Sequence, residues 1–141
     1  MANNLFQGYS HIGVYVTDRE KAIQFYQDVL SFDLLFKVDN ESDGLLIAML
    51  QLGNCYVEVL EPPQGRENIV PGAMSSVNHI GIVVTDIDKA CSHVESFGYS
   101  IENRGIYDVP RFGRPDLDLK VAFFRGPNGE RIELFQELYR K

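Results

Sequence analysis

Two histidines and two glutamates in this 141-residue chain are spaced so that they could hold a metal ion. The histidines, His11 and His79, each open a similar stretch of sequence, HIGVYVTDREKA and HIGIVVTDIDKA. The glutamates, Glu58 and Glu133, each lie in an apolar segment shortly after a turn that contains Gly and Asn. Neutral imidazole and ionised carboxylate suit Ni²⁺, Co²⁺, Zn²⁺, Mn²⁺ or Fe²⁺, and the absence of thiolates disfavours a structural zinc site. The four residues are therefore candidate ligands for one divalent metal ion.

The two stretches form an internal repeat, because eight of their twelve positions are identical. Such a repeat can be purely structural, with two units that bury their apolar faces. The histidines would then be strand residues with satisfied hydrogen bonds, and the glutamates would be charges on edge strands. The metal hypothesis explains more, since it accounts for four polar side chains at equivalent places in apolar strands, where a lone charge is costly.

Each copy of the repeat predicts a strand followed by a helix, and these elements must position the candidate ligands. Residues 9–16 alternate between apolar and other side chains, which is typical of a strand with one buried face. Thr17, with Glu20 three residues later, predicts a capping box at the start of an amphipathic helix. Three further strands are expected in the first half, at residues 33–38, 44–52 and 55–60.

The second half shows the same order of elements. A strand at 77–84 is followed by a helix that Thr85 or Asp86 caps and that ends near Phe97. Three more strands are expected at residues 100–104, 119–125 and 130–136. The second half has about seven more residues between its histidine and its glutamate, and we place them in a loop at 105–117.

Each half is thus most simply a β-α-β-β-β module. We expect module one at residues 7–60, a Pro- and Gly-rich linker at 61–76 and module two at 77–137. Together they make a single α+β domain over residues 1–137, with a tail at 138–141. The sixteen-residue linker allows either one chain to complete a site or two chains to share one.

The composition limits the classes of molecule that the protein is expected to bind. The net charge of −7 argues against nucleic acid or an anionic membrane surface, so a small molecule or another protein is the expected partner. The beginning of the chain resembles no secretory signal and no apolar run is long enough to span a membrane, so we expect a cytoplasmic protein. Cys55 and Cys91 are expected to be reduced thiols, and His93 to be a surface residue of the second helix.

Nearly the whole chain, residues 7–62 and 76–137, resembles the vicinal oxygen chelate superfamily of glyoxalase I, bleomycin-resistance and extradiol-dioxygenase proteins. The resemblance lies in HIGVYVTDREKAIQFYQDVLSF, VEVLEP, VNHIGIVVTDIDKA and GPNGERIELFQ. It implies two βαβββ modules that form a curved eight-stranded sheet around one divalent metal per site, and often a homodimer. The implied ligand positions are His11, Glu58, His79 and Glu133.

The ligand set is similar to that of the glyoxalase I branch, the lactoylglutathione lyases. In that branch a metal-bound glutamate moves a proton between adjacent carbons of a thiohemiacetal, so the resemblance implies Glu133, or Glu58, as the catalytic base. The metal would be Ni, Co or Zn, with Mn or Fe as alternatives. Glutathione-using enzymes typically carry an Arg and an Asn where this chain has Tyr15 and Pro62, so a different thiol adduct or hydroxycarbonyl substrate fits equally well.

Three alternative functions remain open at this stage. VEVLEP also resembles methylmalonyl-CoA epimerase, although that enzyme usually has Gln at the place of Glu58. Its additional base should fall in the strand at 44–50, which has no acid here, and Glu41 is the nearest substitute. The second alternative is a resistance-type module that binds a small molecule without catalysis. The third is an Fe²⁺ dioxygenase, which Glu58 as a fourth ligand disfavours.

The expected extra loop and its flanks concentrate positive charge in an otherwise acidic chain. The cations are Arg104, Arg111, Arg114 and Lys120. The loop could be a lid over a substrate carboxylate or phosphate, with Arg114 as the substrate-binding residue. The simpler interpretation is a solvated loop with internal pairs to Asp108, Asp116 and Asp118. Tyr15 and Tyr56 share strand faces with the ligands, so they are expected either to line the substrate pocket or to serve in packing.

Overall fold

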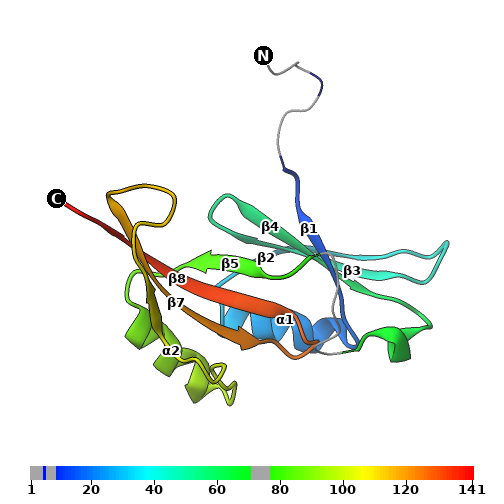
Figure 1. The fold of residues 1–141 in the computed structure, drawn as a ribbon. Helices are drawn as coiled ribbons and strands as arrows, with labels where there is room; N and C mark the ends of the chain where they lie inside the picture. Colours follow the sequence, from blue (N-terminus) through cyan, green and yellow to red (C-terminus); the bar gives the residue numbers. More distant parts are fainter. Residues whose placement is uncertain (1–4, 6–8, 71–76) are drawn as a thin grey trace. The chain divides into compact units, whose positions relative to one another are not determined.

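The structure of the protein is a computed structural model that describes residue 5, residues 9–70 and residues 77–141. The chain divides into two compact units, Met1–Ile69 and Val70–Lys141. Each unit contains one helix and four strands in the order β-α-β-β-β (Figure 1). The predicted α+β class with two β-α-β-β-β modules is therefore confirmed, whereas the module bounds stay predictions.

The first unit contains one helix, α1, and strands β1 to β4, followed by a short 3-10 helix, η1. Their bounds are β1 Ile12–Tyr15, α1 Arg19–Asp28, β2 Asp33–Asp39, β3 Leu46–Leu52, β4 Cys55–Glu61 and η1 Arg66–Asn68. η1 lies in the predicted linker, of which residues 71–76 are outside the described residues.

The second unit contains helix α2 and strands β5 to β8. Their bounds are β5 Ile80–Val83, α2 Ile87–Ser96, β6 Tyr107–Val109, β7 Leu117–Arg125 and β8 Arg131–Tyr139. β8 therefore extends two residues beyond the predicted end of module two.

The eight strands lie in two four-stranded mixed sheets, one in each unit. The strand orders are β1-β4-β3-β2 and β5-β8-β7-β6, so the first and last strands of each module are neighbours. These neighbours, β1 with β4 and β5 with β8, pair in parallel, and all other pairs are antiparallel. The same topology in both units is the structural counterpart of the sequence repeat.

Both helices begin at an aspartate. Asp18 caps α1 by accepting from the backbone N–H of Lys21, and Asp86 caps α2 by accepting from that of Lys89. The prediction of Thr17 as the cap of α1 was wrong, because Asp18 takes the extended conformation of an N-cap. Of the two candidates for α2, Asp86 rather than Thr85 is the cap.

The first helical N–H of each helix is bound by the last strand of the same module. Glu61 of β4 accepts from the Arg19 N–H at 2.6 Å, and Gln136 of β8 accepts from the Ile87 N–H at 3.0 Å. Since these side chains lie three residues after Glu58 and Glu133, the helix start and the candidate ligand of each module share a strand.

The core of each unit lies between its helix and its sheet. α1 packs on β3 and β4, and α2 packs on β7 and β8. The largest fully buried side chains include Tyr26, Leu50 and Val59 in the first unit and Ile87, Phe124 and Ile132 in the second. The alternating strand residues between these core positions are therefore available on the sheet face away from the helix.

The second strand of the second unit differs from the prediction. Residues 100–104 form only an isolated bridge, Ile101 with Phe124, and the strand is β6 instead. Glycines with positive φ lie on both sides of the predicted strand, at Gly98 and Gly105, and end the extended conformation. The extra residues were also misplaced in part, because the β7–β8 turn at 126–130 is longer than the β3–β4 turn at 53–54.

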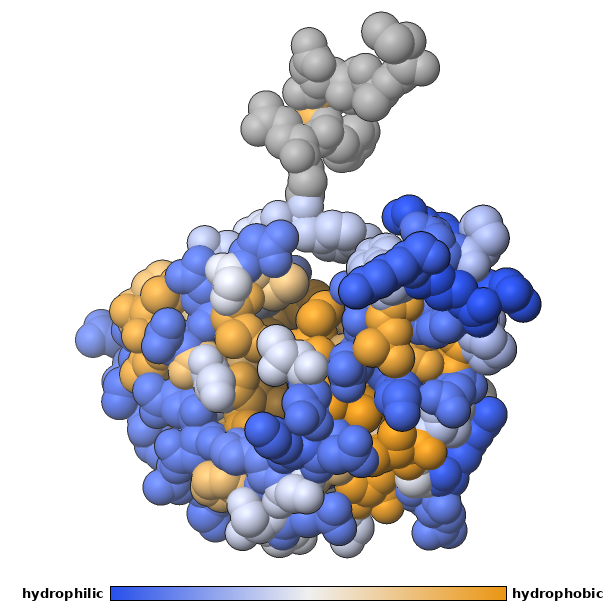
Figure 2. All heavy atoms as spheres, turned by 90° about the vertical axis from the view of Figure 1, so that its left-hand side faces the viewer, coloured by the Kyte–Doolittle hydropathy of each residue, from blue (hydrophilic) through white to orange (hydrophobic). Residues whose placement is uncertain are grey.

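Apolar side chains are exposed in several patches among polar ones on the face drawn in Figure 2. Exposed large apolar residues in the described part of the chain include Leu35, Phe36, Val83, Phe112 and Tyr139. A share of exposed apolar surface is usual in folded domains. In that same part of the chain, neither helix is long and apolar enough to cross a membrane.

Candidate metal centre

In the first unit, His11 and Glu58 form a close pair. His11 lies immediately before β1, and Nε2 of its ring is 3.5 Å from Oε1 of Glu58 on β4. The parallel β1–β4 register places Gly13, two residues after His11, opposite Glu58. The glycine has no side chain, so the residue opposite Glu58 does not cover the carboxylate.

The second unit contains the equivalent pair, His79 and Glu133. The distance from Nε2 of His79 to Oε1 of Glu133 is 3.4 Å. The β5–β8 register places Gly81, two residues after His79, opposite Glu133. The predicted equivalence of the two histidines and of the two glutamates is thus reproduced by strand pairing in both units.

The two pairs also match in their accessibility to solvent. The side-chain exposures are 37% for His11 and 24% for Glu58, against 35% for His79 and 21% for Glu133. Both pairs are therefore partly open to solvent.

The second ring nitrogen of each histidine is bound by the preceding residue. Nδ1 of His11 lies 2.8 Å from the hydroxyl of Ser10, and Nδ1 of His79 lies 2.7 Å from Oδ1 of Asn78. A ligating imidazole usually donates its other N–H to such a partner, which orients the ring. In both units, Nε2 is therefore the nitrogen that is directed at the glutamate.

The donor atoms of each pair fit a divalent ion. Adjacent ligands of an octahedral ion held at about 2.1 Å lie about 3 Å apart, close to the 3.4 and 3.5 Å separations of the two pairs. Among the described residues of either unit, no third His, Cys, Asp or Glu joins its pair. A centre with all four ligands would combine the two pairs, and it stays a prediction.

The two tyrosines predicted to bind substrate line different cavities of the first unit. Tyr56 and His11 share a cavity of about 330 Å³ with Met49 and with two residues of β2, Leu35 and Phe36. Tyr15 instead lines a cavity of about 360 Å³ beside Pro62. Tyr56 is therefore the tyrosine that the fold brings next to a candidate ligand.

Arg114, the predicted substrate-binding arginine, is engaged within its own loop. Its Nε and Nη2 atoms each donate to Asp116 at 3.0 Å, and this hydrogen bonding raises the pKa of Arg114. The backbone N–H of Arg111 donates to Asp118, which also binds Arg140. These internal pairs were the expected alternative to a lid, and a substrate-binding role for Arg114 stays a prediction.

The third histidine lies apart from the candidate ligands in its unit. His93 is exposed on α2, and its ring packs against Phe97 at a centroid distance of 5.1 Å. The expectation of a surface residue is confirmed.

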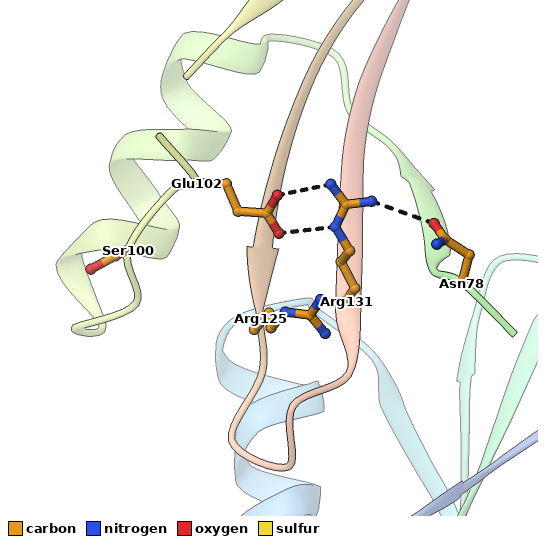
Figure 3. A pocket seen from close by; sticks show the side chains of 5 residues that line it. All are labelled: Asn78, Ser100, Glu102, Arg125 and Arg131. Atoms are coloured by element: carbon orange, nitrogen blue, oxygen red, sulfur yellow. Dashed lines mark hydrogen bonds and ion pairs between the residues drawn. The ribbon is translucent and has the colours of Figure 1, made fainter. Parts of the chain in front are cut away.

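A polar network next to His79 was not predicted from the sequence. Arg131 donates to Glu102 through two hydrogen bonds and to Asn78 through a third, as Figure 3 shows. These three residues line a cavity of about 560 Å³ together with Ser100 and Arg125. The sequence signal for Arg131 and Asn78 was their position, two residues before Glu133 and one before His79.

The network changes the ionisation of its two charged members. The hydrogen bond from Arg131 lowers the pKa of Glu102, although partial burial acts in the opposite direction. The same hydrogen bond raises the pKa of Arg131. Each group therefore stays charged over a wider pH range than it would without its partner.

The model of the glyoxalase/bleomycin resistance protein/dioxygenase superfamily matches residues 8–134. The chain belongs to this superfamily. Membership confirms the resemblance drawn from the repeated histidine segments and the GPNG hairpin. The description of the family names more than one kind of protein, so membership by itself does not specify the reaction.

Relatives of several functions are found within the superfamily. A probable lactoylglutathione lyase of Synechocystis sp. is 28% identical over 93% of this chain and 96% of its own length. The human mitochondrial methylmalonyl-CoA epimerase is 30% identical over 57% of this chain and 48% of its own. The solved structure of the Listeria monocytogenes fosfomycin resistance protein FosX, complexed with Mn(II) and sulfate, shares the fold with a TM-score of 0.68. FosX is 13% identical over 94% of this chain and 93% of its own.

Proposed function

We propose that this protein is a divalent-metal-dependent lyase or isomerase of the glyoxalase type. It would move a proton between adjacent carbons of a small carbonyl or thiohemiacetal substrate. The observation that carries the proposal is the pair of equivalent His–Glu arrangements, each with an Nε2 atom directed at a carboxylate oxygen. His11, Glu58, His79 and Glu133 would be the ligands, within one chain or across a homodimer.

The metal, as Ni²⁺, Co²⁺, Zn²⁺, Mn²⁺ or Fe²⁺, would supply Lewis acidity, which makes a proton next to a carbonyl easier to remove. The chain's own groups would do the rest. Glu133, with Glu58 as the equivalent candidate, would take the proton from one carbon and return it to the neighbouring carbon. Ser10 and Asn78 would hold the rings of His11 and His79 in place through their contacts with Nδ1.

The substrate would be small and partly apolar. The cavity that includes His11 is lined mainly by Leu35, Phe36, Met49 and aromatic side chains. The lyase relative from Synechocystis, which matches along nearly the whole chain, supports a thiohemiacetal as the substrate. Tyr15 and Pro62 replace the residues typical of glutathione-using enzymes, which favours a thiol other than glutathione.

An epimerase acting on a CoA ester is the second candidate. The human epimerase relative supports it, and the chemistry again removes a proton next to a carbonyl. The additional acid expected in β3 is missing, because β3 reads LIAMLQL. Glu41, the substitute, is exposed in the turn between β2 and β3, so we rank this candidate second.

The decisive experiment is a calorimetric titration of metal-stripped protein with Ni²⁺, Co²⁺, Zn²⁺ and Mn²⁺. We expect one ion per site, and affinity at least about tenfold weaker in Glu133→Gln and in Glu58→Gln. Glu95→Gln, on the exposed surface of α2, is the matched control and should bind like the parent. Absence of stoichiometric binding would leave a small-molecule-binding module without catalysis.

Proton transfer can be followed without knowing the natural substrate. The loaded protein would be incubated in D₂O with methylglyoxal–thiol adducts and, separately, with CoA esters that carry an acidic C–H. Deuterium incorporation detected by NMR identifies the class that is turned over, and Glu133→Gln should abolish it. Sedimentation analysis of the same samples tests the homodimer.

A further inference from the structure

We propose that Arg131 is a positioning residue that fixes the tautomer and ring orientation of His79 through Asn78, with Glu102 holding Arg131 in place. We call these three residues the Glu102–Arg131–Asn78 relay. The inference rests on the proposed function only in giving His79 a metal to bind. The geometry of the relay stands on its own.

The relay begins with a two-pronged ion pair. Nε and Nη2 of Arg131 donate to the two oxygens of Glu102 at 2.9 and 2.8 Å. Two parallel charge-assisted bonds fix the plane of a guanidinium as well as its position. Figure 3 shows the remaining edge of the guanidinium turned toward Asn78.

That remaining edge determines which atom of Asn78 faces it. Nη1 of Arg131 donates to Oδ1 of Asn78 at 3.4 Å. A guanidinium has donors only, so the amide must present its oxygen rather than its NH₂ group. The amide of Asn78 is thereby held in one of its two flips.

The same oxygen lies 2.7 Å from Nδ1 of His79. Because an amide oxygen only accepts, Nδ1 of His79 must carry the hydrogen, and in the neutral ring Nε2 carries the lone pair. Nε2 lies 3.4 Å from Oε1 of Glu133. The relay therefore presets the nitrogen that faces the carboxylate as a free metal donor.

Phe123 makes an aromatic contact with both Arg131 and His79. The guanidinium carbon of Arg131 lies 3.8 Å from the ring centroid of Phe123, which is buried. The ring of His79 meets the same phenyl ring edge-on, at 5.5 Å and 87°. Arg131 and His79 are thus joined both through Asn78 and through Phe123.

The first unit holds its histidine in a different way. Tyr56 occupies the place of Arg131, two residues before the glutamate, and Ser10 occupies the place of Asn78. The Ser10 hydroxyl can either donate or accept, so its 2.8 Å contact with Nδ1 is compatible with both tautomers of His11. The repeat therefore contains one preset histidine and one adaptable histidine.

The test is the tautomer of His79 in metal-free protein, read from long-range ¹H–¹⁵N NMR spectra of ¹⁵N-histidine-labelled samples under alkaline conditions. The parent should show His79 with the hydrogen on Nδ1. Arg131→Met and Asn78→Leu should each convert the signal to a mixture of tautomers, whereas Asn78→Asp, which keeps an accepting oxygen, should retain the parent state. Arg125→Met, which removes another arginine of the same cavity, is the matched control.

Metal titration of the same variants separates the two proposals. Loss of the relay should weaken binding by about 10–100-fold, as for other partners of ligating histidines. If the tautomer responds but the parent binds no metal, the relay holds and the proposed function fails. The relay is overturned if the parent binds metal and both Arg131→Met and Asn78→Leu show the same His79 tautomer as the parent. Should Arg131→Met fail to fold, the His79 tautomer in Asn78→Leu and in Asn78→Asp is compared instead, and the relay requires that the two variants differ.

Discussion

Glu133 lies directly opposite Gly81 in the parallel ladder between β5 and β8. The pairing is repeated between Glu58 and Gly13 in the other unit. A strand residue facing a candidate ligand would normally cover it with a side chain, and in both copies that side chain is missing. The open space above each carboxylate is thus built into the ladder.

Filling this space should weaken metal binding. A Cβ atom at Gly81 would lie 3.5 Å from Oε1 of Glu133 and 3.4 Å from a ring carbon of Phe135, which is ordinary contact. Gly81→Ala should therefore bind metal nearly as the parent does. In Gly81→Val the additional methyl groups reach further, and we expect a loss of about tenfold or more in calorimetric titration. Equal affinity in the two variants would show that this space is not needed.

The helix caps give a prediction about stability. Replacing Asp86 by Ala removes the side-chain acceptor for the Lys89 N–H and should lower the free energy of unfolding by about 0.5–2 kcal/mol. Thr85→Ala is the control one residue earlier, where the exposed side chain should matter by less than about 0.5 kcal/mol. Urea denaturation of both variants measures the difference. A larger effect at Thr85 would contradict the assignment of the cap.

The repeat explains why much of this fold could be predicted from sequence. Its two copies carry the same order of strands and helix, and in both the glycine two residues after the histidine pairs with the glutamate. Thr17 and Glu20 match the capping-box pattern, but the neighbouring Asp18 is the residue that caps the helix. A choice between neighbouring capping residues depends on backbone angles, which a pattern does not reveal.

The relay was harder to predict, because its first member comes from an irregular segment. Glu102 follows an isolated bridge and lies in a turn that ends at Gly105. It meets Arg131 across the sheet only through tertiary folding. Local propensity carries no information about such a pair, whereas Asn78 could have been found from its position beside His79.

The Glu102–Arg131 pair predicts a pH-dependent part of stability. The folded-state pKa of Glu102 lies below its ordinary value of 4.5, so its contribution is complete above about pH 4.5 and is lost as the pH falls through the lower folded-state pKa. The carboxylate is partly exposed, so we expect less than about 1 kcal/mol. Urea denaturation of the parent and Glu102→Gln should show a difference near neutral pH that shrinks in acid. A difference that grows in acid would contradict the sign.

The two thiols should differ in reactivity. Cys91 is buried in α2, and burial, followed by the charges of Glu95 and Asp88, raises its pKa. Cys55 is exposed at the start of β4. Because the thiolate is the nucleophile, iodoacetamide should modify Cys55 first and should reach Cys91 only after unfolding in urea. Peptide mass spectrometry measures both sites, and equal rates in the folded protein would contradict this order.

The parallel pairing of first and last strands has a consequence for how each unit folds. The β3–β4 hairpin closes over a two-residue turn, whereas β1 and β4 are separated by the rest of the module and must close a long loop to pair. His11 and Glu58 come together only when these two strands pair. In a nascent or partly unfolded module the histidine and the glutamate are therefore apart. Metal binding by a His–Glu pair would then indicate that the first and last strands of that module have paired.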